Sequence, residues 1–308
     1  MHMHVMIATG GIFALLLLAS MVIYLMQRRR PEKDYQELRL RLKSWWVMAI
    51  VFCAALLVHR TVSIVFLAFL SFLAFKEYLS LIPTRDTDRR VLFWAYLAIP
   101  LQFYWIYIDW YGMAILFIPV YMFLLLPIRA VLHGETEGFL RAMGTLNWGL
   151  MITVFSLSHI ALLLILPDQR NPNGGGVALV IFLVFLTEAN DIFQYLWGKL
   201  LGRRKVVPKV SPNKTWGGLL GGIVSTVTLS IMLSHWLTPL SIQSAIVVGL
   251  MIAVGGFFGD VVISSLKRDL KIKDSGSLLP GHGGILDRVD SLSYTAPLFF
   301  HFVHYFYY

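Results

Sequence analysis

The sequence predicts an all-α, polytopic integral membrane protein with nine or ten transmembrane helices. Of the 308 residues, 57% are hydrophobic and only 14% are charged, whereas a soluble globular domain carries roughly 25% charged residues. The chain also contains repeated apolar runs of about the 20 residues that a helix needs to cross a bilayer. These observations exclude a soluble cytosolic enzyme and a disordered chain. The single cysteine, Cys53, excludes an intrachain disulfide scaffold and a cysteine-rich zinc site.

Ten apolar runs are candidates for the spans. Three arginines at positions 28–30 follow the first run, whereas a signal peptide carries its positive charges before its apolar core, so we expect a retained first helix. The last run is short and aromatic, which is typical of either a final span or an interfacial helix and leaves the count at nine or ten. The runs are Val5–Met26, Trp45–Val58, Thr61–Leu79, Val91–Ile108, Tyr111–Leu126, Met143–Leu166, Gly176–Trp197, Gly217–Leu237, Ile242–Leu266 and Leu292–Tyr308.

The lysine and arginine residues predict the orientation of these spans. Of the 26 such residues, 23 fall in alternate loops, within residues 28–43, 85–90, 129–141, 199–214 and 267–288. Cytoplasmic loops carry an excess of positive charge, so we expect the N-terminus outside and every basic loop in the cytoplasm. The net charge of +9 favours anionic partners such as lipid headgroups or phosphates.

Loop lengths divide the chain into parts. The turn His59-Arg60 joins the second and third runs, and Asp109-Trp110 joins the fourth and fifth, so each pair is predicted to form a tight hairpin. The later cytoplasmic loops are long, basic and rich in glycine, proline, serine and asparagine. We predict N-terminal transmembrane helices in residues 1–80, middle transmembrane helices in residues 81–170, and a C-terminal catalytic transmembrane domain in residues 171–308.

Ionisable residues inside the spans are candidates for a functional site, because charge is costly in hydrocarbon. Glu188 and Asp191 lie three residues apart, as do Asp191 and Gln194, so they share one helix face. Asp260 follows a glycine-rich string near the cytoplasmic end of its span. The alternatives are a polar seam that joins helices, and a simple pairing of Asp260 with a lysine or arginine.

The loop at residues 211–218 precedes the next span and has the features of a phosphate-binding helix start. Ser211, Asn213 and Thr215 are good helix caps, and Lys214 lies among them. Free backbone N–H groups beside a lysine bind phosphate well. The alternative is an ordinary capped helix start. The glycine spacing of a P-loop is absent.

The stretch from Ser264 to Asp290 has the densest mixture of charges in the chain. Carboxylates and cations surround a glycine-rich turn, a composition that suits Mg²⁺-assisted phosphoryl transfer, in which carboxylates hold the ion and cations neutralise phosphate charge. The cations are Lys267, Arg268, Lys271, Lys273 and Arg288, and the carboxylates are Asp269, Asp274, Asp287 and Asp290.

This stretch resembles the signature of the phosphatidate cytidylyltransferase (CDP-diglyceride synthase) family. Residues 211–216 resemble the second motif of that family, and the likeness covers roughly residues 185–300. The resemblance implies a membrane enzyme that joins CTP and phosphatidic acid to give CDP-diacylglycerol and pyrophosphate, with Mg²⁺ or Mn²⁺. The lipid phosphate would attack the α-phosphorus of CTP directly. A bacterial inner membrane is the expected location, and nucleic acid is not an expected partner.

The resemblance also assigns roles to residues. Asp260 and Asp287 would be the metal ligands, and Asp274 and Asp290 would complete the acidic catalytic set. Gly283 and Gly284, with His282, would let the loop close over the nucleotide. The cations Lys267, Arg268, Lys273 and Arg288 would meet the phosphates, and Ser211, Asn213, Lys214, Thr215 and Asp191 would bind substrate.

The sequence departs from the family pattern at three places and leaves alternatives open. Ile263 stands where a glutamate is common, Gly217 where an acidic or amide residue is common, and residues 192–194 are bulkier than usual. The alternatives are a CTP-dependent enzyme acting on another lipid phosphate, and a non-catalytic lipid-binding or transport protein. A transporter would place its charges near the midplane in broken helices, whereas here they gather at the cytoplasmic end. The sequence also leaves open a monovalent cation beside the metal and a homodimer.

Overall fold

The computed structural model describes residues 3–32, 34–82, 89–132, 134, 136–276, 278 and 283–308, with the side chains of 89 and 90 left out. Within these ranges it is helical and has no β-strand. Two shorter apolar helices, α4 (Arg89–Tyr107) and α13 (Leu292–Tyr307), accompany the longer ones. Eight helices are long and apolar enough to cross a membrane: Met3–Arg29, Gln36–Val58, Arg60–Leu81, Tyr111–Val131, Phe139–Leu163, Gly175–Leu201, Trp216–Leu237 and Ile242–Asp269. The predicted all-α, multi-pass membrane fold is therefore confirmed.

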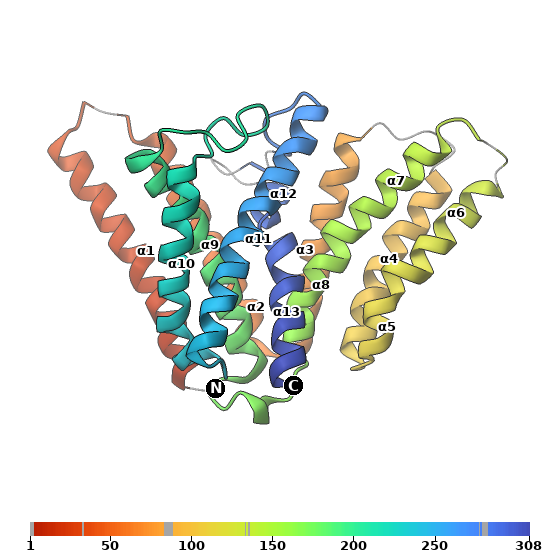
Figure 1. Ribbon diagram of the computed structural model, residues 1–308, viewed down its shortest axis with the longest axis horizontal. Coiled ribbons are helices and arrows are strands. Elements are labelled where there is room, and N and C mark those ends of the chain that lie inside the picture. Colours follow the sequence, from red (N-terminus) through yellow and green to blue (C-terminus); the bar gives the residue numbers. More distant parts are fainter. Residues whose placement is uncertain are drawn as a thin grey trace.

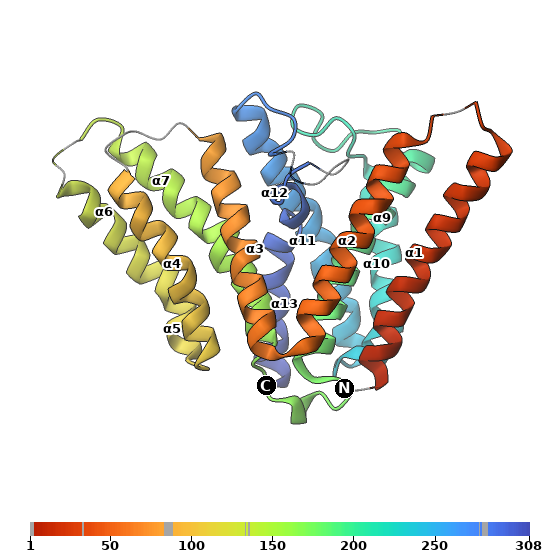
Figure 2. The same ribbon diagram turned by 180° about the vertical axis from the view of Figure 1, so that it is seen from behind.

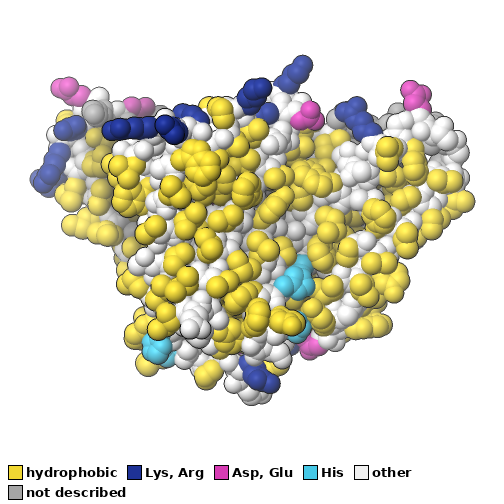
Figure 3. All heavy atoms as spheres, viewed as in Figure 1, with side chains coloured by type: hydrophobic (Ala, Val, Ile, Leu, Met, Phe, Trp, Pro, Cys, Tyr) yellow, Lys and Arg dark blue, Asp and Glu magenta, His cyan; other side chains and the backbone are white. Residues whose placement is uncertain are grey.

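The helices run side by side between two ends of the molecule (Figures 1 and 2). The helices α1 (Met3–Arg29) and α10 (Trp216–Leu237) lie on one flank, and the α4–α7 helices form the other. Both termini lie at the same end. Lysine and arginine side chains gather at the opposite end (Figure 3). The described parts of the basic loops thus share one end of the bundle, while the assignment of that end to the cytoplasm stays a prediction.

Two of the predicted spans differ from the structure, one in where its helix begins and one in the regularity of its helix. Helix α2 (Gln36–Val58) begins nine residues before Trp45, because its first turns carry basic side chains that reach water from the helix end. The span after α4 consists of α5 (Tyr111–Leu116), a π-helical turn η2 (Phe117–Met122) and α6 (Phe123–Val131). Pro119 lies in that turn and lacks the N–H that a regular α-helix requires.

The most buried part of the bundle is built from the second half of the chain. Every residue of helix α8 (Ser156–Leu163) after Ser156 is buried; the helix follows α7 (Phe139–Leu150) and a second π-helical turn, η3 (Met151–Phe155). Helix α9 (Gly175–Leu201) follows the short 3₁₀ turn η4 (Asp168–Arg170) and packs closely on α10. This close packing needs small residues, and a Cβ on Gly218 would lie 2.6 Å from the Gln194 carbonyl oxygen.

The signature segment folds back into the bundle. After α11 (Ile242–Asp269) the chain forms a loop at the basic end and returns to a short buried helix, α12 (Leu286–Val289), before α13 begins. Figure 1 shows α12 below the basic end, between α11 and α3 (Arg60–Leu81). This return places the polar residues of the signature against the ends of α9, α10 and α11.

Candidate active site

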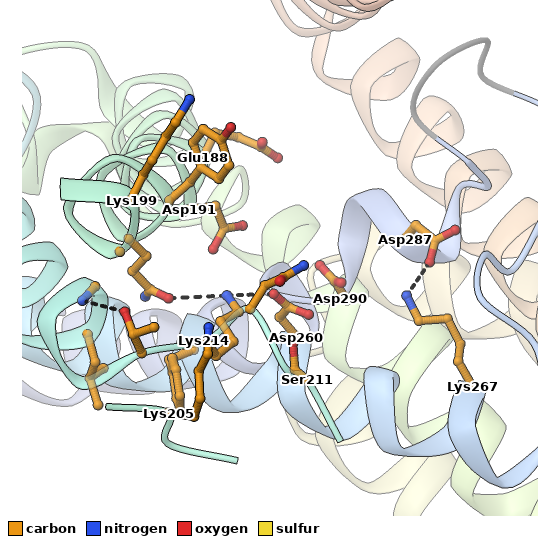
Figure 4. A pocket seen from close by; sticks show the side chains of 18 of the residues that line it. Glu188, Asp191, Lys199, Lys205, Ser211, Lys214, Asp260, Lys267, Asp287 and Asp290 are labelled. Carbon is orange, nitrogen blue, oxygen red and sulfur yellow. Dashed lines mark hydrogen bonds and ion pairs between the residues drawn. The ribbon is translucent and has the colours of Figure 1, made fainter. Parts of the chain in front are cut away.

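A cavity of about 680 Å³ lies where α9, the loop before α10, α11 and the segment between α11 and α13 meet. This last segment, residues 270–291, is called the returning segment. Figure 4 shows its lysine and carboxylate side chains facing one another. Eleven of the residues predicted from the sequence line it: Asp191, Ser211, Asn213, Lys214, Thr215, Asp260, Lys267, Asp274, Asp287, Arg288 and Asp290. The structure therefore brings together three stretches that are far apart in the chain.

Lys214 is the central cation on one side of the cavity. Its Nζ lies 2.6 Å from Asp260 Oδ2 and donates to Gln194 Oε1 at 3.2 Å. The same nitrogen lies 5.5 Å from the centre of the Phe257 ring, within the range of a cation–π interaction. Burial acts to lower the pKa of Lys214, but the carboxylates of Asp260 and Asp191 outweigh it and raise that pKa. Lys214 is therefore held charged.

The loop that carries Lys214 is fixed by its own backbone. The Val206 N–H donates to the Lys214 carbonyl at 3.0 Å, and the Thr215 hydroxyl accepts from the Gly218 N–H at 3.1 Å. The hydroxyl thereby caps α10, as the sequence predicts. Because the cap and the lysine are adjacent residues, the start of α10 sets where the ammonium group lies.

Three carboxylates gather around this lysine. Asp260 accepts from Ser264 Oγ at 3.1 Å, and Asp191 accepts from Ser291 Oγ at 3.0 Å. Asp290 lies beside them in Figure 4. Burial, followed by the charges of Asp260 and Asp191, raises the pKa of Asp290 well above its usual value. The three carboxylates outnumber the two cations that act on them, Lys214 and Arg288, so the group favours an additional cation.

Asp287 lies apart from this group and has a lysine of its own (Figure 4). Its Oδ1 is 2.6 Å from Lys267 Nζ, and its Oδ2 accepts from the backbone N–H groups of Ser275 at 2.9 Å and Gly284 at 3.0 Å. Burial acts to raise the pKa of Asp287, but the Lys267 hydrogen bond and charge, with those N–H groups, lower it. Asp287 is thus held ionised.

The glycine pair of the signature is required by close contacts. Gly283 has φ +81°, and a Cβ there would lie 2.6 Å from Asp287 Oδ2. A Cβ on Gly284 would overlap the carboxylate of Glu77. The two glycines therefore let two carboxylates approach the same turn.

The donor set suits a hard cation, although no three acidic, histidine or cysteine side chains in the described ranges form a ready metal cluster. Mg²⁺ is held in phosphoryl-transfer sites by one or two carboxylates together with substrate phosphates and water. The carboxylate oxygens of the cavity are of the kind that this ion prefers. The residues present therefore fit Mg²⁺ bound with substrate, and the metal roles of Asp260 and Asp287 stay predictions.

Four of the predicted site residues, Arg268, Lys273, Gly283 and Gly284, do not line the cavity. Arg268 is exposed, and its Nε donates to the Val210 carbonyl at 3.2 Å. Lys273 is also exposed. His282 lies outside the described residues.

The sequence analysis also missed residues. Lys199, Lys205 and Tyr195 line the cavity, and Glu77 contacts the returning segment from α3. Glu77 lies inside the predicted span 61–79, so the cost of an acidic side chain in a span is the signal that finds it.

Comparisons with known proteins identify relatives of this chain. A model of the cytidylyltransferase family matches residues 39–306. An uncharacterised protein of Escherichia coli K12, YnbB, is 47% identical over 294 residues, which are 96% of each chain. Phosphatidate cytidylyltransferase 5 of Arabidopsis thaliana chloroplasts is 44% identical over 140 residues, 45% of this chain and 35% of that protein.

A bacterial relative adds to this. The phosphatidate cytidylyltransferase of Brucella melitensis is 36% identical over 154 residues, 50% of this chain and 55% of that protein. The match to each of these two enzymes thus covers less than two thirds of the enzyme's length. The eight long apolar helices of this chain and its bacterial relatives agree with the prediction of a multi-pass protein in a bacterial inner membrane. The match over most of its length shows that the chain belongs to the cytidylyltransferase family of nucleotidyltransferases.

Proposed function

We propose that the protein joins CTP and phosphatidic acid to give CDP-diacylglycerol and pyrophosphate. The observation that carries the proposal is a cavity at the basic end of a membrane bundle, in which Lys214 is paired with Asp260 and Lys267 with Asp287. The names of the Arabidopsis and Brucella relatives support the choice of substrates.

The reaction is a direct displacement at the α-phosphorus of CTP. An oxygen of the lipid phosphate forms the new P–O bond, the bond to the β-phosphate oxygen breaks, and pyrophosphate leaves with that electron pair. The described lining contains no cysteine, and no histidine that could activate the hydroxyls of Ser211 and Thr215, which favours direct attack over a covalent enzyme intermediate. Lys214, Lys267 and Arg288 stabilise the charge that develops on the phosphates.

Asp260 and Asp287 are the proposed carboxylate ligands of Mg²⁺. These two side chains would hold the ion, which would supply positive charge to neutralise the phosphates. Lys214 and Lys267 occupy the two carboxylates at 2.6 Å each. The lysines thus hold both carboxylates in place, and they can turn to phosphate oxygens when substrate arrives.

The lipid reaches the cavity from the membrane side. Apolar side chains, Tyr195, Leu219 and Phe257, line the cavity beside Lys214, and Tyr195 is exposed on the surface of α9. A two-chain lipid can lie along such a surface with its phosphate at the lysines, because headgroup and acyl chains then keep their own environments. Lys199 and Lys205, also in the lining, add positive charge at this side.

The test is an assay with CTP, phosphatidic acid and Mg²⁺ in detergent, comparing the wild-type protein with Asp287→Asn. We expect CDP-diacylglycerol from the wild type and a fall of about 10²- to 10³-fold in the variant, the usual cost of removing one group that stabilises transition-state charge. Asp269→Asn, an exposed change in the same signature stretch, is the matched control and keeps full activity.

Two results would contradict the proposal. Unchanged product formation by Asp287→Asn would remove Asp287 from the mechanism. Absence of product from folded wild-type protein would exclude phosphatidic acid, and a panel of other lipid phosphates would then separate a different substrate from a non-catalytic protein.

A further inference from the structure

Glu77 joins the N-terminal part of the chain to the signature segment. It lies in the last turns of α3, and its carboxylate accepts from the backbone N–H groups of Ile285 at 2.8 Å and Leu286 at 3.2 Å. The hydroxyl of Ser275 donates to the same carboxylate. These contacts tie both ends of the returning loop to α3, a helix with no residue in the described cavity lining.

The backbone groups that Glu77 binds have no substitute partner in a helix. Ile285 and Leu286 begin α12, and the first N–H groups of a helix have no intrahelical acceptor. Both residues are buried, so loss of the carboxylate would leave two N–H groups buried and unpaired. Each such group costs about 1–3 kcal/mol.

Glu77 and Asp287 hold the same turn from two sides. Ser275 Oγ contacts Glu77 Oε1 and lies 2.9 Å from Asp287 Oδ2. Gly284 donates its N–H to Asp287, while its Cα faces Glu77 so closely that a Cβ would overlap the carboxylate. A shift of Glu77 therefore moves the donors that orient Asp287.

The end of α3 is a firm support for this contact. The neighbouring residue, Tyr78, is fully buried, and its hydroxyl donates to the Thr145 carbonyl at 2.9 Å. Its ring packs against Trp148, with centroids 5.8 Å apart. Because α3 is anchored to α7 at this level, Glu77 has little freedom to follow a loop that moves.

We propose that Glu77 is a positioning residue for the cytidylyl-transfer site, acting through Ser275 and Gly284 to fix the carboxylate of Asp287 against Lys267. The inference rests on the proposed function for its kinetic consequence, whereas its structural part does not. Glu77 touches neither substrate in this scheme. Its role is to hold the returning segment in the geometry that Asp287 needs.

The test compares Glu77→Gln with Glu37→Gln. Glutamine keeps the size of the side chain but removes its charge and one acceptor, and Glu37 is an exposed residue of α2 whose carboxylate pairs with Arg41 at 2.5 Å. We expect Glu77→Gln to lower kcat and to raise the Mg²⁺ concentration for half-maximal activity by about 10- to 100-fold, as when an outer partner of a metal ligand is lost. Glu37→Gln should leave both unchanged.

A second readout does not depend on activity. Hydrogen exchange measured by mass spectrometry should become faster in peptides covering residues 275–290 of Glu77→Gln, and should stay at the wild-type rate in peptides of α9 and α10. If the wild type makes no CDP-diacylglycerol but this exchange pattern is found, the proposed function fails and the positioning role stands. Unchanged exchange in an active protein overturns the positioning role.

Ser275→Ala covers the case in which Glu77→Gln does not fold. It removes the hydroxyl between the two carboxylates and leaves the bonds from Glu77 to Ile285 and Leu286 in place. We expect the same direction of change in Mg²⁺ dependence, and smaller. Wild-type Mg²⁺ dependence in Ser275→Ala would contradict the proposed route from Glu77 to Asp287.

Discussion

Lys214 is the single side chain on which the charge balance of the cavity most depends. It contacts Asp260 directly, and Asp191 and Asp290 are close enough to influence its pKa. Its side chain is 18% exposed and that of Asp260 is 27% exposed, so solvent screens the pair only in part. Removal of the lysine leaves several carboxylates facing one another with Arg288 as the remaining cation that acts on Asp191 and Asp290.

Lys214→Met should therefore lose stability as well as activity. Breaking one partner of a buried ion pair costs about 3–5 kcal/mol, and thermal unfolding in detergent should show a clear fall in Tm. The double variant Lys214→Met/Asp260→Asn should recover part of that loss, because it removes the unpaired charge. Lys209→Met, an exposed change in the same loop, is the control. An unchanged Tm in Lys214→Met would contradict this account.

Helices α9 and α10 form the element that carries the phosphate-binding loop. Their close contact depends on glycines of α10, since a Cβ on Gly218 would lie 2.6 Å from the Gln194 carbonyl and 3.1 Å from Gly198 Cα. Gln194 in turn accepts a hydrogen bond from Lys214. Separation of the two helices would therefore displace the lysine, even though no charged residue has changed.

Comparison of Gly218→Ala with Gly144→Ala should separate the effect of the α9–α10 contact on stability from the effect of helix propensity. Overpacking of this kind costs about 1–3 kcal/mol, so we expect a lower Tm and reduced activity. Gly144→Ala, on α7 with nothing within 4 Å of the added Cβ, should be neutral or stabilise by up to about 1 kcal/mol. Equal Tm changes in the two variants would show that the close contact between α9 and α10 does not determine the stability of the protein.

At the scale of the whole molecule, the charge distribution sorts the loops to two ends. The basic loops lie at one end, and the termini, the α2–α3 turn and the α8–α9 loop lie at the other (Figures 1 and 3). The positive-inside rule assigns the basic end to the cytoplasm. The proposed reaction requires the same orientation, since CTP is a cytoplasmic nucleotide.

Labelling of single cysteines in intact cells measures this orientation. After replacement of Cys53, which is buried, Gln169→Cys in the exposed η4 turn should react with a membrane-impermeant maleimide from outside. Lys209→Cys should react only after the membrane is permeabilised. The reverse pattern would place the cavity outside and would rule out CTP as its substrate.

The sequence predicts the spans and most of the cavity because these depend on short-range patterns. Run length and basic loops identify the helices, and Lys267 and Asp287 lie in one motif that the structure closes into an ion pair. The direction of Arg268 follows from geometry instead, since the next residue on a helix points about 100° away from Lys267. The role of Glu77 was not predicted because its partners, Ile285 and Leu286, lie in a distant part of the chain.

The contact between Glu77 and Ile285 joins residues 208 positions apart in the chain, and this distance has a meaning during biosynthesis. At roughly 5–20 residues per second, the carboxylate of α3 leaves the ribosome about 10–40 s before the backbone groups that it binds. A nascent chain that ends after α11 therefore contains Glu77, Lys214 and Lys267 but lacks Asp287 and the backbone groups that Glu77 binds. The later arrival of α12 and α13 completes the centre, so under the proposed function a partly synthesised chain cannot consume CTP.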